Sequence, residues 1–99
     1  MWTPLHLACR SGHTKVAGLL LELNVNVNCY SQFGETPLHM ASQGGHCSVI
    51  DLLLQRKADV EATDRVRETP LHWACQHARN AETIELLLRN HANVDQENK

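Results

Sequence analysis

A tetrapeptide that recurs at a fixed interval constrains the fold of this chain more than any other feature. Thr-Pro-Leu-His occurs at residues 3–6, 36–39 and 69–72, so both intervals are 33 residues. A run of three leucines follows each copy, at 19–21, 52–54 and 86–88. Internal periods of roughly 20–50 residues are typical of arrays in which each unit packs on the next. The sequence therefore predicts three stacked units, over residues 3–35, 36–68 and 69–99, in a single array over residues 1–99.

Each unit is predicted to contain two short helices. The threonine of the tetrapeptide suits a helix N-cap, and the proline that follows suits the first helical position, where no backbone N–H is needed. We expect the first helices at 5–10, 38–43 and 71–76, and the second helices at 14–22, 47–56 and 81–90. Helices of this length are unstable alone in water, so packing between units must stabilise them.

Turns and loops complete the unit. Asn24, Lys57 and His91 follow the second helices, where we expect a left-handed turn. The polar stretches 28–35 and 62–68 join one unit to the next, and we predict extended, hairpin-like loops there.

These motifs together resemble the ankyrin repeat family. The period of 33 residues, the string Thr-Pro-Leu-His-x-Ala, the triple leucines and the Gly-His pairs at 12–13 and 45–46 carry the resemblance, which covers nearly the whole chain. It implies an all-α repeat solenoid: an ankyrin-type helix-turn-helix stack with short β-hairpin-like loops. It also implies a module that binds other proteins and has no active site.

The third unit departs from the pattern. It has one extra residue between its helices, and Arg79-Asn80 replaces the Gly-His pair, which puts that turn in doubt; Asn80 is still able to cap the second helix. Arg67 stands where Gly34 stands one unit earlier, so we expect the second loop to be distorted.

The histidines and cysteines do not indicate a metal or catalytic site. His6, His39 and His72 recur at the repeat spacing, too far apart in a stack to converge on one zinc ion. We expect each imidazole instead to bond the threonine three residues earlier and neighbouring backbone. Cys9 and Cys75 are equivalent to Ser42, which predicts a small packed position. We expect no enzyme activity, no metal and no cofactor.

Charge and hydropathy exclude two classes of partner. The net charge is −2, and no run of Lys or Arg is long enough to follow a phosphate backbone, so nucleic acid is not expected. No apolar stretch is long enough to enter a membrane. Free thiols are typical of a reducing compartment, which predicts an intracellular, cytoplasmic or nuclear location.

The family resemblance places the partner-binding surface on the loop tips and the ends of the first helices, on the concave face. Exposed aromatic residues on loops are frequent binding anchors, which favours Phe33 and Trp2. For Trp2 an equal alternative is an apolar end that a further repeat would cover. The predicted site comprises Trp2, Arg10, Ser11, Gln32, Phe33, Glu35, Gln43, Arg65, Val66, Glu68, Gln76 and His77.

An alternative function is open. Neither end unit is clearly polar on its outer face, since unit one contains Val16, Leu19 and Leu20 and unit three contains Ile84, Leu87 and Leu88. This pattern predicts either a structural segment of a longer solenoid or a divergent minimal array. If these faces are bare, we expect self-association through the uncapped terminal repeats.

Overall fold

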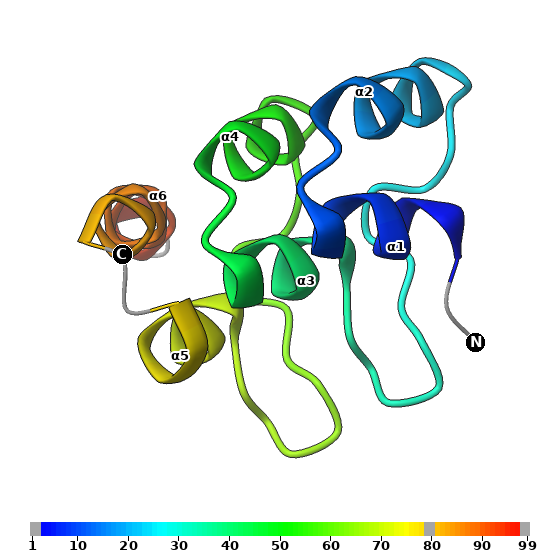
Figure 1. Ribbon diagram of the computed structural model, residues 1–99. Helices are drawn as coiled ribbons and strands as arrows, with labels where there is room; N and C mark the ends of the chain where they lie inside the picture. The colour runs from blue at the N-terminus through cyan, green and yellow to red at the C-terminus, as the bar shows by residue number, and fades with distance from the viewer. Residues whose placement is uncertain (1–2, 79–80, 98–99) are drawn as a thin grey trace.

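The structure is a computed structural model that describes residues 3–78 and 81–97 (Figure 1). In this part of the chain every regular element is a helix. The α-helices are α1 (Pro4–Ser11), α2 (Thr14–Glu22), α3 (Pro37–Gly44), α4 (Cys47–Gln55), α5 (Pro70–Trp73) and α6 (Ala81–Glu97). A π turn, η1 (Ala74–Ala78), directly continues α5.

The helices lie in two rows. The first helices α1, α3 and α5 form one row, the second helices α2, α4 and α6 form the other, and two loops extend from the side of the first helices (Figure 1). Helix α3 packs between α1 and the α5–η1 segment, and α4 packs between α2 and α6. The predicted all-α stack of helix pairs is confirmed.

The threonines begin the first helices as expected. The Thr36 hydroxyl accepts a hydrogen bond from the His39 backbone N–H at 3.3 Å, and the His39 ring accepts one from the Thr36 backbone N–H at 3.1 Å. The same reciprocal capping box forms at Thr3 and at Thr69. Glycines with positive φ, Gly12 and Gly45, end α1 and α3.

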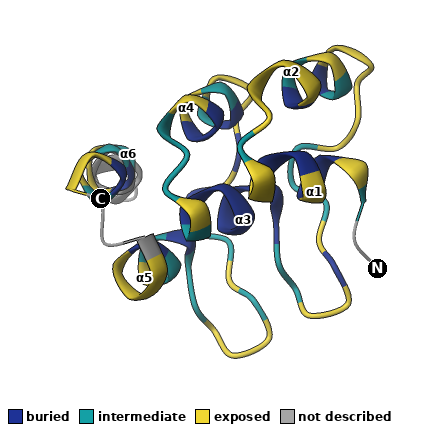
Figure 2. Ribbon diagram, viewed as in Figure 1, coloured by how far each residue is buried: buried dark blue, intermediate teal, exposed yellow. Residues whose placement is uncertain are grey.

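The core runs along the middle of the stack. Every residue of α3 from Pro37 to Ser42 is buried, because first helices cover it on both sides (Figure 2). Leucines from each unit complete the core, among them Leu5, Leu38, Leu53 and Leu87. Leu87 is 2% exposed, so its expected place on a bare outer face is wrong; it packs inward, while Leu88 is 47% exposed.

The third unit differs from the prediction at both helices. The predicted first helix, 71–76, is instead a short α5 followed by the π turn, which takes up the extra residue as an i→i+5 coil. The second helix was expected to end at Asn90, but α6 continues to Glu97, so the predicted left-handed turn at His91 is wrong. No proline or glycine follows Asn90 to stop the helix. The turn predicted at Arg79-Asn80 lies outside the described residues.

The other predicted left-handed turns are confirmed at Asn24 (φ 65°) and Lys57 (φ 68°). We name residues 28–35 the first finger loop and residues 62–68 the second finger loop. Each is closed by hairpin-type backbone bonds, without the regular pairing of a strand. The expected distortion of the second loop is wrong: Arg67 adopts φ 66°, close to the 78° of Gly34, and the loop keeps the same hydrogen bonds.

Candidate protein-binding surface

Two buried histidines attach the finger loops to the helices. His6 accepts the backbone N–H of Thr3 at Nδ1, so its Nε2–H donates to the Glu35 carbonyl, at 2.6 Å. His39 makes the equivalent bond to the Glu68 carbonyl at 2.8 Å. Each imidazole therefore fixes the end of a finger loop against the first helix of the same unit, and for these two histidines the predicted bonds to the threonine and to neighbouring backbone are confirmed.

The protonation of these rings follows from their surroundings. Burial lowers the pKa of both His6 and His39, and this effect exceeds the opposite influence of the carbonyls of Glu35 and Glu68. The rings are neutral near pH 7, which matches a donor at Nε2 and an acceptor at Nδ1. His46 makes a comparable link, from Nε2 to the Arg10 carbonyl at 3.0 Å.

Inside each loop a polar side chain organises the backbone. In the second loop, Asp64 accepts the N–H groups of Val66 and Glu68 and the indole N–H of Trp73, at 3.0, 2.9 and 3.0 Å. Burial alone would raise the pKa of Asp64, but these hydrogen bonds outweigh it and lower the pKa below its usual range. Ser31 has the equivalent role in the first loop, where its hydroxyl accepts from Phe33 and Glu35.

The two finger loops meet near their tips. The backbone N–H of Arg65 donates to the carbonyl of Phe33 at 3.0 Å. A hollow of about 240 Å³ lies beside this bond and is lined by Phe33, Glu35, Asp64, Arg65 and Val66. Phe33 is 46% exposed and Val66 is 70% exposed, although neither is needed for the core. The wall of the hollow therefore combines two apolar side chains with two carboxylates, Glu35 and Asp64, and one guanidinium group, Arg65.

The structure brings four of the twelve predicted site residues around this one hollow: Phe33, Glu35, Arg65 and Val66. Two more predicted residues are linked to its wall through Asp64, which accepts the Glu68 backbone N–H at 2.9 Å, while the Gln76 amide donates to the Glu68 carboxylate at 3.1 Å. Gln32 is exposed in the first loop, and His77 is exposed in η1, where it lies 5.6 Å from the Trp73 ring. The remaining described residues, Arg10, Ser11 and Gln43, lie near the C-terminal ends of α1 and α3 and do not line the hollow, and Trp2 lies outside the described residues.

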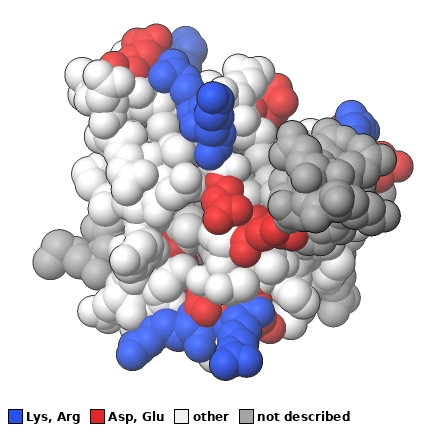
Figure 3. All heavy atoms as spheres, turned by 180° about the vertical axis from the view of Figure 1, so that it is seen from behind, with Lys and Arg blue, Asp and Glu red and all other residues white. Residues whose placement is uncertain are grey.

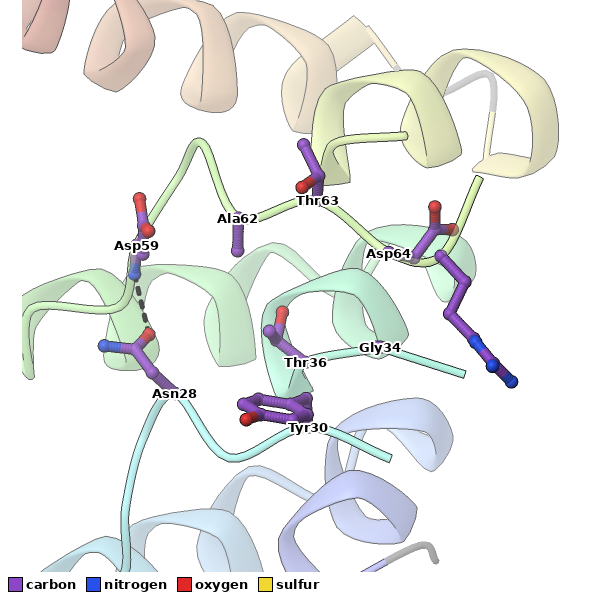
Figure 4. Close-up of a pocket in the computed structure, with 9 residues that line it drawn as sticks. Asn28, Tyr30, Gly34, Thr36, Asp59, Ala62, Thr63 and Asp64 are labelled. Atoms are coloured by element: carbon purple, nitrogen blue, oxygen red, sulfur yellow. Dashed lines mark hydrogen bonds between the residues drawn. The ribbon is translucent and has the colours of Figure 1, made fainter. Parts of the chain in front are cut away.

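The sequence did not single out two residues of this surface, Asp64 and Tyr30. Asp64 is equivalent to Ser31, one repeat earlier. The sequence signal that could have identified it is a side chain able to accept backbone N–H groups at the same position of both loops. Tyr30 is 73% exposed and lines a second cavity, of about 420 Å³, between the two loops. A bond from the Asp59 N–H to Asn28 Oδ1, at 2.8 Å, closes one end of that cavity (Figure 4).

Cysteine chemistry adds nothing to the site. All four cysteines are free thiols, and burial raises the pKa of Cys9 to about 12, which leaves it unreactive. Cys75 is exposed, so the expected packed position is wrong there; it lies in the π turn, whose wider coil changes which side chains face inward. Among the described residues, no group of three or more His, Cys, Asp or Glu could hold a metal ion. No helix in the same residues is long and apolar enough to cross a membrane.

Comparison with known families identifies the architecture. A family model described as ankyrin repeats in three copies matches residues 1–64 and again residues 24–98. The chain belongs to the ankyrin repeat family. Ankyrin repeats are generally protein–protein interaction modules and are typically non-enzymatic. No curated protein matches the chain.

Proposed function

We propose that this ankyrin array is a non-enzymatic module that binds a partner protein through its finger loops and the adjoining first helices. The hollow between Phe33 and Val66 is the observation that carries the proposal. Exposed apolar side chains around a concave site, set on loops held by a rigid scaffold, are typical of binding anchors. The free thiols favour action in a reducing compartment, the cytoplasm or the nucleus.

The test is a quantitative pull-down from cell lysate with the wild-type chain and a Phe33→Ala/Val66→Ala variant. Loss of two anchors should weaken capture of a specific partner about ten-fold or more. Thermal unfolding should change little, because both side chains lie outside the core. A Leu23→Ala variant is the control, since Leu23 is 74% exposed but follows α2, in neither finger loop. Equal capture by all three chains would refute this surface.

A second function, self-association through an end face, has an observation of its own. Leu7 is 51% exposed and Val16 is 46% exposed, whereas their equivalents one unit later, Met40 and Val49, are fully buried. Leu19, at 62%, adds to the same face of unit one. In unit two a neighbouring helix pair covers these apolar positions. In unit one the equivalent side chains are exposed.

Sedimentation velocity at increasing concentration tests this second function. The wild-type chain should form dimers or longer species, and a Val16→Glu/Leu19→Glu variant should remain monomeric. The equivalent change at Leu87 is unsuitable because that side chain is in the core. A wild-type chain that stays monomeric over the whole range would exclude self-association.

A further inference from the structure

The acceptor groups of the finger-loop surface are already in use within the chain. Asp64 accepts three hydrogen bonds from its own loop and from Trp73. Glu35 accepts from the Ser31 hydroxyl at 3.1 Å, and Glu68 accepts from Gln76. Most acceptor positions of Asp64 are thus occupied, and the carboxylates of Glu35 and Glu68 are each held by one donor of the chain itself.

Two strong donor groups of the same surface, the guanidinium groups of Arg65 and Arg67, are not used within the described part of the chain. Arg65 and Arg67 are the only Lys or Arg residues in either finger loop, and both are exposed. Within the described residues, neither guanidinium takes part in a hydrogen bond or an ion pair. Seen from behind, Lys and Arg side chains gather at the edge where the finger loops end (Figure 3). Each guanidinium presents five N–H donors in a planar fork that matches a carboxylate.

Apolar side chains lie directly beside these donors. Val66 stands between the two arginines in sequence, and Phe33 lies across the hollow that Arg65 also lines. The larger cavity, with Tyr30 on its wall, is lined by Arg65 as well. The loop tips therefore combine apolar contact area with two strong donor groups that have no partner in the part of the chain that the structure describes.

We propose that the partner recognised here is an acidic protein segment, in which an apolar side chain enters the hollow between Phe33 and Val66 and flanking carboxylates bind Arg65 and Arg67. This inference rests on the proposed function, because it assigns the chemistry of the partner to the same surface. Charge-assisted bonds from arginine are strong and geometrically specific, so they would select among partners that share the apolar anchor.

Other partner chemistries fit less well. A basic segment would leave both guanidinium groups without acceptors and place like charges together at the loop tips. A nucleic acid carries a phosphate at every nucleotide and needs a basic stripe along its backbone, whereas the finger loops supply only the two arginines. An acidic apolar segment uses the donors and the apolar surface together.

The experiment selects a phage-displayed library of random 12-residue peptides against the full chain. Enriched peptides should share an apolar residue with Asp or Glu within a few positions. In fluorescence titrations, an Arg65→Glu/Arg67→Glu variant should bind the enriched peptides at least ten-fold more weakly. A Lys15→Glu/Arg89→Glu variant carries the same change in charge on exposed positions of α2 and α6, and it should bind normally.

The outcomes separate this inference from the proposed function. Enriched peptides that require Phe33 and Val66 but show no acidic preference would overturn the acidic partner and leave the binding surface intact. Tighter arginine-dependent binding of a 12-nucleotide single-stranded RNA than of any peptide would also overturn it. If no peptide depends on any finger-loop residue, the proposed surface itself is wrong.

Discussion

At residue 67 the chain places an arginine in a backbone conformation that its own repeat assigns to glycine. Arg67 has φ 66° and Gly34 has φ 78° at equivalent positions. A left-handed conformation costs an L-residue about 1 kcal/mol, which glycine avoids. The surroundings differ, because a Cβ at Gly34 would lie 3.1 Å from the backbone of Asp64 and Arg65 in the next loop.

These two positions should respond in opposite directions to substitution. Arg67→Gly should raise the free energy of unfolding by about 0.5 kcal/mol. Glycine relieves the backbone strain of the folded chain, and its greater conformational freedom in the unfolded chain cancels part of that gain. Gly34→Ala should lower it by about 1–3 kcal/mol through strain and crowding. Urea unfolding followed by circular dichroism measures both. Shifts of the same sign in the two variants would contradict this account.

Residue roles that repeat were predictable, and those created by one unit alone were not. The hydrogen bonds of His6 and His39 were predictable because the Thr-Pro-Leu-His motif occurs three times, each time where a helix begins and its backbone N–H groups need a cap. The left-handed backbone at Arg67 was predictable because Gly34 occupies the equivalent position. That the second finger loop keeps its shape with an arginine there was not predictable. The bond from Trp73 to Asp64 joins positions nine residues apart through a tryptophan found only in the third unit, so periodicity carries no information about it.

Among the elements, the capped starts of the first helices make the stack sensitive to pH. Burial lowers the pKa of His6 and His39 in the folded chain, whereas the unfolded chain titrates near 6.5. Below pH 6.5 the unfolded state therefore binds protons that the folded state does not. Stability falls with pH from 6.5 down to the folded pKa, by at most about 1.4 kcal/mol per pH unit for each imidazole.

A His39→Gln variant isolates one of these contributions. Glutamine can still reach back to the Thr36 backbone as part of a capping box, but it does not titrate. The free energy of unfolding should depend less on pH between 6.5 and 5 than in the wild-type chain, although the variant is less stable at pH 7. Asp64, with a lowered pKa, titrates below this window. An unaltered slope in His39→Gln would refute the assignment.

Helix boundaries were predictable where the sequence marks them with proline, glycine or threonine. In units one and two, threonine starts each first helix and a glycine with positive φ ends it, and the second helices fall within one residue of their expected bounds. In unit three the marking residues are missing after Trp73 and after Asn90. There the chain forms a π turn and a long α6, outcomes that depend on packing rather than on a local signal.

Over the whole molecule, the middle unit connects the other two. Helix α3 packs on α1 and on the α5–η1 segment, and α4 packs on α2 and on α6. In a one-dimensional array, stability is the sum of unit and interface contributions, so the middle unit takes part in both interfaces. Sequence periodicity predicts this order of units, yet it does not predict which partner the loops between them recognise, because loop residues vary without cost to the stack.

Equivalent leucines should therefore contribute unequally to stability. Leu53 of α4 is fully buried, whereas its counterpart in α2, Leu20, is only partly buried. Leu53→Ala should lower the free energy of unfolding by about 3–4 kcal/mol, a large part of the roughly 5–15 kcal/mol expected for a domain of this size, and Leu20→Ala by about 1–2 kcal/mol. Urea unfolding, followed by circular dichroism and by tryptophan fluorescence, gives both values. Equal losses in the two variants would mean that the units do not depend on their neighbours, and the stack would then be three independent helix pairs in contact.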